Sequence, residues 1–236
     1  MASLLYLDSY AINDRIKIRI PKVGEILDNE DLYYDAICPI IATPYDMMVQ
    51  LDDNGIDFTK INSFELFCLM IGKLKEIDTS LVFVDLNLKN FRTAVNEKNG
   101  NMILLDINDK TIIDRAIHDQ ICTFIRKMLY MPKNDKTPGN EEARKYMIER
   151  ARIKQARRKK KKVESQLERF IVALVNTSEF PYNYETVRNL SIYQFYASLK
   201  QISQKIRFDN TMIGCYAGTV KFDDLSSDER TWIQIE

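Results

Sequence analysis

Residues 133–139 read Lys-Asn-Asp-Lys-Thr-Pro-Gly, and this stretch decides the fold because it divides the chain into halves of different character. The segment is polar, ends in a turn-forming Pro-Gly pair and has no apolar anchor, which is typical of a linker. Strand patterns precede it, whereas helix-forming residues dominate after it. We predict an α+β, predominantly helical fold, with an N-terminal mixed domain at 1–132, a linker at 133–139 and a C-terminal helical domain at 140–236.

The sequence pattern of the N-terminal half predicts a small antiparallel sheet. Residues 15–20 alternate cations with isoleucines, the period of a half-buried strand. Further strand signals lie at 81–84, 91–95 and 102–107, and the Asn99-Gly100 turn between the last two predicts a β-hairpin.

Helices fill the rest of this half. Short ones are predicted at 23–29, 30–41 and 45–53, the second limited by Pro39 and the third ending at Asn54-Gly55. A longer helix opens at Asn62 or Ser63, and another opens at Asp109 or Thr111 and closes before Pro132. Their predicted buried stripes are Phe64, Phe67, Cys68, Ile71 and Leu74 in the first, and Ile113, Ile117, Ile121, Phe124 and Met128 in the second.

The second half is predicted to consist mainly of helices, with an aromatic turn at residues 180–184. Asn140 caps a helix that continues, with or without a break, to Val175. Its first part has only a thin apolar edge, formed by Ala143, Met147, Ala151 and Ile153. Ser191 caps another helix with an inner face of Phe195, Leu199, Ile202 and Ile206. A final short helix or turn ends at Trp232.

Charge is strongly segregated along the chain. Residues 144–162 hold eleven of the 34 basic residues and one of the 34 acidic residues, although the net charge of the whole chain is zero. Three interpretations stay open: a solvated helix face, contact with an acidic protein surface (a partner or this chain's own remainder), or binding of nucleic acid phosphates. Base stacking is poorly provided for, because Tyr146 is the one aromatic residue in the run.

Catalytic and metal-binding motifs are missing from the sequence. His118 has no second histidine to pair with, and residues 50–61 resemble a calcium loop only in part, since Gln50 and Ile61 occupy the first and last ligand positions. There is no phosphate-binding loop, nucleophile elbow or HExxH motif. The four dispersed cysteines are typical of core residues in a reducing compartment. We expect neither enzymatic activity, nor a cofactor, nor a bound metal.

The N-terminus lacks a basic region followed by an apolar run, and no segment has the apolar length of a membrane span. We therefore expect a protein without membrane contacts that works in the cytoplasm.

Several segments resemble proteins encoded among the tail genes of phages, or prophages, of Gram-positive bacteria. These are residues 18–26, 42–46, 55–61, 138–140, 174–176, 182–187, 190–195, 200–202 and 214–218, followed by Trp232. The resemblance implies a tail assembly chaperone, a host-cytoplasmic factor that keeps the tape-measure protein soluble until the tail tube polymerises around it. A structural virion protein of the tail, such as a baseplate, hub or connector subunit, is the alternative, and a nucleic-acid-binding factor is the third.

The predicted partners are thus phage tail proteins, above all the tape-measure protein and then the tail tube, with homo-oligomerisation left open. The predicted partner-binding residues combine the basic run with the C-terminal aromatic residues. They are Arg150, Lys154, Arg157, Arg158, Lys159, Lys160, Lys161, Lys162, Tyr182, Tyr184, Tyr193 and Trp232.

Overall fold

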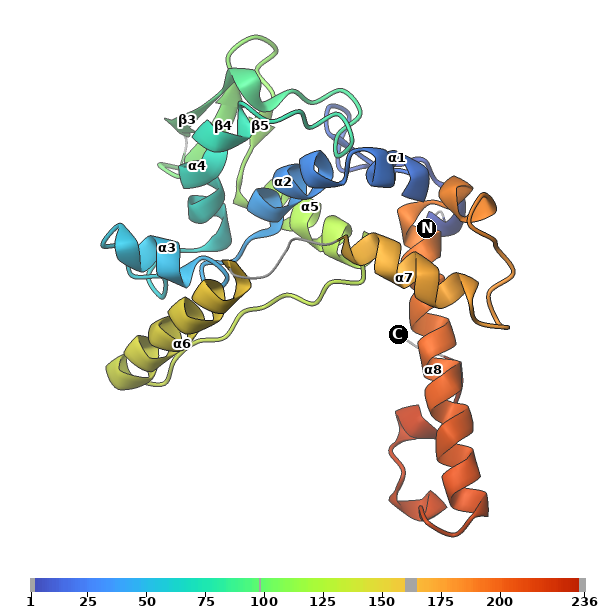
Figure 1. Cartoon of the computed structure of the whole chain (residues 1–236). Helices are drawn as coiled ribbons and strands as arrows, with labels where there is room; N and C mark the ends of the chain where they lie inside the picture. The colour runs from blue at the N-terminus through green and yellow to red at the C-terminus, as the bar shows by residue number, and fades with distance from the viewer. Residues whose placement is uncertain (1–2, 98, 160–164, 234–236) are drawn as a thin grey trace.

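The computed structural model describes residues 3–97, 99–159 and 165–233. Within them the fold is α+β and predominantly helical, as predicted, with both sheets in the N-terminal half. A central body carries two helical arms, α6 (Glu141–Lys159) and α8 (Ile192–Tyr216), which extend from the same side of it (Figure 1). Among the described residues, no helix combines the length and the apolar character needed to cross a membrane.

The first sheet is a two-stranded antiparallel pair of β1 (Ser9–Ala11) and β2 (Lys17–Arg19). The alternation in the sequence places Ile16, Ile18 and Ile20 in the core, with exposed fractions of 4% or less. The predicted strand at 81–84 is wrong in extent: only Phe83 forms a bridge, opposite Ile18. Tight turns at 79–83 prevent a longer ladder, because the amides of Val82 and Phe83 both bond to the carbonyl of Thr79.

The second sheet contains the predicted hairpin, β3 (Phe91–Val95) and β4 (Met102–Asp106). Gly100 has a positive φ of 70° in the turn between them, a conformation that glycine adopts without strain. A third short strand, β5 (Ile112–Ile113), pairs with β4 and was not predicted.

The N-terminal helices are α1 (Val23–Asp28), α2 (Glu30–Ile41), α3 (Met48–Asp53), α4 (Ser63–Leu74) and α5 (Arg115–Met128). The side chain of Asn62 caps α4, and the whole predicted stripe of α4 is buried. α2 has the predicted bounds, and Pro39 lies inside the helix rather than limiting it. The predicted start of α5 is wrong: Asp114 caps this helix, and Ile113 belongs to β5 instead.

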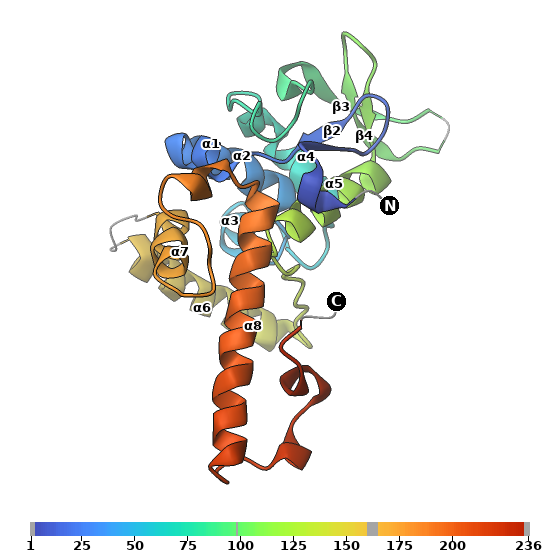
Figure 2. The same ribbon diagram turned by 90° about the vertical axis from the view of Figure 1, so that its right-hand side faces the viewer.

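The C-terminal half consists of α6, α7 (Gln166–Val175) and α8, followed by two 3-10 turns at Phe222–Asp224 and Ser227–Arg230. Asn140 caps α6 through its side-chain oxygen, 2.8 Å from the amide nitrogen of Ala143, and Ser191 caps α8. Residues 131–138 form neither helix nor strand. Figure 2 shows α8 descending from the body, with the chain that follows this helix returning beside it.

The main hydrophobic core joins both halves of the chain. It contains Ile16, Ile18 and Phe67 from the first half together with Leu167 and Phe195 from the second. Backbone hydrogen bonds cross between the halves as well: the amide of Val23 donates to the carbonyl of Leu190 at 2.9 Å, and that of Ile192 donates to Pro21 at 2.9 Å. The division into domains at 133–139 stays a prediction.

A second, smaller cluster lies apart from this core, beneath α6. Its buried members are Ala42, Met48, Val49, Leu51, Phe58, Leu66 and Ile148. Ile148 is the buried residue that α6 contributes, so α6 is attached to the body through this cluster rather than through the main core.

Candidate interaction surfaces

The basic helix α6 is seated on α3 by a narrow apolar strip. Ile148 is 5% exposed there, with Met147 and Ala151 packed partly buried beside it. Ile153, predicted to be part of the apolar edge, is 48% exposed instead. Ile148 and Ile153 are five positions apart, and the helical period cannot place both on one side of α6. Ile148 is the one that faces α3.

Ion pairs flank this strip and connect the basic run to the chain's own acidic remainder. Arg152 contacts Asp52 at 2.7 Å and Asp53 at 2.6 Å, both at the end of α3. Nearer the outer tip of α6, a guanidinium nitrogen of Arg144 lies 3.8 Å from Asp57. The carboxylates of Asp52 and Asp53 raise the pKa of Arg152. Thr59, by hydrogen bonds, and then Arg144 lower the pKa of Asp57.

The remaining predicted cations of α6 are directed to solvent. Arg150, Lys154, Arg157 and Arg158 are exposed. The guanidinium of Arg150 lies over the ring of Tyr146, 5.7 Å from its centroid. The backbone of Lys159 ends α6, while Lys160, Lys161 and Lys162 lie outside the described residues. The described part of α6 therefore offers an exposed basic face on the side turned away from α3.

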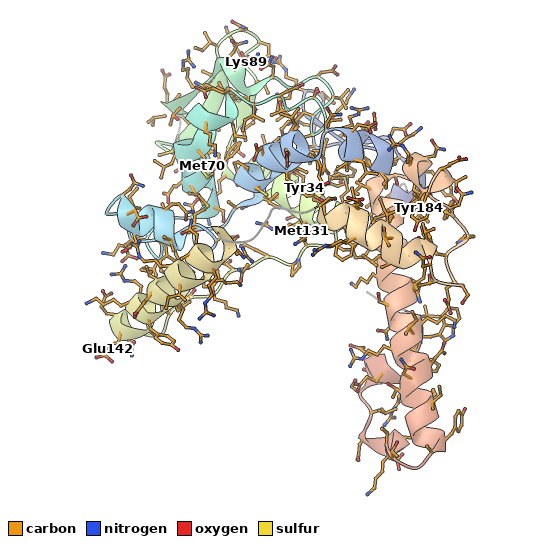
Figure 3. The ribbon with its side chains drawn as sticks, in the orientation of Figure 1. Tyr34, Met70, Lys89, Met131, Glu142 and Tyr184 are labelled. Carbon is orange, nitrogen blue, oxygen red and sulfur yellow. The ribbon has the colours of Figure 1, made fainter. Side chains whose placement is uncertain are left out.

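The predicted aromatic residues do not form one surface. Tyr182 and Tyr184 lie in the loop after α7 and are 37% and 54% exposed. Tyr193, near the start of α8, stacks on Tyr130 with ring centroids 5.7 Å apart. Trp232 lies at the end of the chain's return beside α8, where its carbonyl accepts a hydrogen bond from Gln201 at 2.6 Å. Figure 3 shows Tyr184 on the far side of the molecule from α6, which carries the label of Glu142.

The outer half of α8 and the segment after it form an arm that leaves the core. Phe195 is fully buried at the base of this helix, but Ile206 is 40% exposed, so the predicted inner face ends before it. The returning segment is fixed by polar contacts: Arg207 pairs with Glu229 at 2.8 Å, and Gln204 donates to the carbonyl of Asp228 at 2.8 Å.

Apolar side chains remain uncovered on this arm, which we call the C-terminal arm (residues 203–233). Those with large exposed fractions are Ile213 at 64%, Tyr216 at 89%, Phe222 at 50%, Trp232 at 48% and Ile233 at 52%. A shallow hollow lined by Ile206 and Val220 separates α8 from the returning segment. Ile213 and Tyr216 lie in the last turns of α8, Phe222 lies in the first 3-10 turn after it, and Trp232 lies beside Gln201 further back along the helix. Exposed apolar groups are characteristic of protein-binding surfaces.

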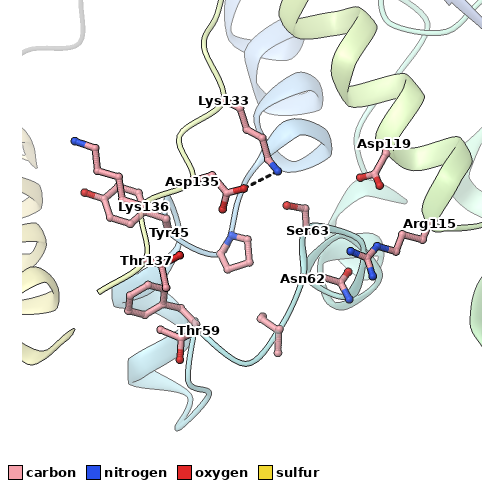
Figure 4. A pocket seen from close by; sticks show the side chains of 13 residues that line it. Tyr45, Thr59, Asn62, Ser63, Arg115, Asp119, Lys133, Asp135, Lys136 and Thr137 are labelled. Atoms are coloured by element: carbon pink, nitrogen blue, oxygen red, sulfur yellow. Dashed lines mark ion pairs between the residues drawn. The ribbon is translucent and has the colours of Figure 1, made fainter. Parts of the chain in front are cut away.

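A polar hollow lies where residues 133–137 pass the starts of α4 and α5 (Figure 4). Lys133 and Asp135 form an ion pair at its rim, with 2.6 Å between nitrogen and oxygen. Arg115 and Asp119 face it from α5, and Ser63 faces it from the start of α4. Its cations and anions are mixed, so the lining does not select an ion of one sign.

His118 is a core residue in the structure. It is fully buried, stacks on Phe67 with centroids 4.6 Å apart, and its Nε2 lies 3.0 Å from the carbonyl oxygen of Ile40. Burial lowers its pKa, which the Ile40 carbonyl partly opposes. The thiol of Cys122 shares the same carbonyl at 3.3 Å. In the described part of the chain, no three His, Cys, Asp or Glu side chains cluster as metal ligands would.

Comparison with known proteins relates the C-terminal part of the chain to phages. Residues 158–235 match the family described as the YomV second domain, which is a phage- or prophage-type family. The match begins at the end of α6 and covers α7, α8 and the C-terminal arm. No curated protein and no solved structure matches the chain.

Proposed function

We propose that this protein is a non-enzymatic factor of phage tail morphogenesis, a tail assembly chaperone that holds the tape-measure protein in the host cytoplasm. The observation that carries the proposal is the C-terminal arm, an exposed apolar element within the segment that matches a phage-type family. A helical client with apolar stripes needs such a surface to replace its missing partners. The tail-specific role itself rests on the sequence resemblance.

Co-expression of the cognate tape-measure protein tests this role. The chaperone should keep the client in the supernatant. The double variant Ile213→Ser and Tyr216→Ser removes two of the most exposed apolar groups of the arm and should lose that effect. Val95→Ser is the matched control, because Val95 is an equally exposed apolar residue, at 66%, on the β-hairpin. A client that precipitates with the unaltered protein, or one that both variants retain equally, contradicts the proposal.

A structural subunit of the tail is the second candidate, and the same exposed arm supports it. Such a subunit would bury the arm permanently in the assembled particle, whereas a chaperone releases its client. The two differ in whether the protein is present in finished particles.

Nucleic acid binding by the exposed face of α6 is the third candidate. Replacing Arg150, Lys154, Arg157 and Arg158 by Gln removes four described cations from that face. If they contact phosphates, binding to any DNA duplex should weaken and its dependence on salt should flatten. The same test extends to Lys159–Lys162. Absence of duplex binding by the unaltered protein removes this candidate.

A further inference from the structure

The contact between α6 and the body resembles a bound peptide more than a core helix. α6 buries a single apolar side chain, Ile148, in the small cluster, and it is flanked on its N-terminal side by an exposed segment, residues 131–137, without helix or strand. Asn134 ties that segment to the body by accepting a hydrogen bond from Thr43 at 2.7 Å and donating one to Asp46 at 3.0 Å.

The body surface beneath α6 has a definite chemical character. Its floor is apolar and consists of Met48, Val49, Leu51, Phe58 and Leu66. Its sequence from 42 to 59 contains Asp46, Asp52, Asp53 and Asp57 and no lysine or arginine. An apolar floor with an acidic rim complements a helix that carries an apolar strip between basic side chains.

α6 has both features that complement this surface, an apolar strip and basic side chains beside it. Its strip of Met147, Ile148 and Ala151 lies between Arg144 and Arg152, which are eight residues or about 12 Å apart along a helix. Arg152 pairs with Asp52 of the rim at 2.7 Å, whereas Arg144 lies 3.8 Å from Asp57 and pairs more closely, at 2.6 Å, with Glu141 of its own helix. The pairs of Arg152 with Asp52 and Asp53 are exposed, whereas Arg144 and Asp57 are half-buried. Exposed pairs confer specificity and salt sensitivity more than strength.

We propose that the face of α3 beneath α6 is a binding groove for a basic amphipathic helix of another protein, and that α6 closes this groove by occupying it. A partner helix with the same pattern competes with α6 and displaces it. Displacement frees Arg144 and Arg152 from the carboxylates of the body for a second contact. The groove is a binding surface in addition to the C-terminal arm, and the inference does not depend on which protein is the client.

A labelled peptide tests the groove directly. The probe is fluorescein-labelled residues 141–159, and its control is the same peptide with Ile148→Asp. The full-length variant Ile148→Asp should unseat the internal helix and leave the groove open to the probe. In the unaltered protein α6 occupies the groove, so the probe binds only the fraction of molecules in which the groove is open, and its apparent affinity falls in proportion to that fraction. The probe should therefore bind the Ile148→Asp variant at least about tenfold more tightly than the unaltered protein.

The matched control is Ile153→Asp, five positions along the same helix at an exposed site. It should bind the probe as weakly as the unaltered protein does. Adding Asp52→Asn and Asp53→Asn to the Ile148→Asp variant should reverse its gain in affinity. Equal binding by the Ile148→Asp and Ile153→Asp variants, or no binding of the probe by any of them, overturns the proposal and leaves the proposed chaperone role untouched.

Amide hydrogen exchange of the unaltered protein gives an independent answer if Ile148→Asp prevents folding. Exchange in α6 should be faster than in the buried α5. It should also accelerate from 0.1 M to 1 M salt, because salt screens the ion pairs of Arg144 and Arg152 that help to hold α6 on the body. Protection of α6 equal to that of α5 and independent of salt overturns the proposal.

Discussion

Replacement of Phe195 by Ala tests whether the two halves of the chain are stabilised by one core. Phe195 is fully buried at the base of α8 and belongs to the same cluster as Ile18 and Phe67. Removal of a buried Phe ring costs about 3–5 kcal/mol in free energy of unfolding, from lost transfer energy and from the cavity that remains. For a chain of this size the melting temperature should fall by roughly 10 °C.

The assay is urea unfolding followed by two probes, the fluorescence of the single tryptophan, Trp232, and hydrogen exchange in α4. Both transitions should move together to lower urea. Ile206→Ala on the same helix, at a site 40% exposed, serves as the control and should cost about 1 kcal/mol or less. A loss of protection confined to residues after 140 would refute the reasoning and show that the halves are independent domains.

Three further predictions concern single sites. The free energy of unfolding should fall as the pH is lowered below about 6.5, by up to about 1.4 kcal/mol per pH unit. The reason is that burial lowers the pKa of His118 in the folded protein, so acid protonates this residue first in the unfolded chain. His118→Gln should show a flatter profile in denaturation at pH 5 to 8, and an unchanged profile would contradict this. Gly24→Ala should destabilise the protein by about 1–3 kcal/mol in thermal unfolding, since the added methyl would lie 3.1 Å from both Cβ and the carbonyl oxygen of Arg188. Asn62→Ala removes the side-chain cap of α4 and should cost about 0.5–2 kcal/mol, whereas Asn62→Asp should cost less; equal losses would argue against a capping role.

Local signals in the sequence predicted the regular elements well where they depend on neighbouring residues. Asn62, Asn140 and Ser191 cap helices as expected, and the alternation at 15–20 and the Asn99-Gly100 turn gave the correct strands. Errors occurred where contacts distant in sequence decide the outcome. Ile113 has helical spacing with Ile117, yet pairing with Leu104 draws it into β5.

The surfaces were predicted less completely, for a related reason. The basic run could be found from composition. Which isoleucine of α6 is buried, Ile148 or Ile153, depends on where α3 lies. Asp52, Asp53 and Asp57 were missed as partners of the basic run, because they are about 100 residues away in the chain, as the Asp52–Arg152 pair shows. Their clustering without cations is the signal that could have suggested an acidic surface.

Quantitative mass spectrometry of purified phage particles beside the infected-cell lysate tests the central claim most directly. We predict abundant protein in the lysate and none in the particles, because an assembly chaperone leaves before the tail is complete. A fixed copy number in the particles would contradict the chaperone role and make the protein a structural subunit of the tail.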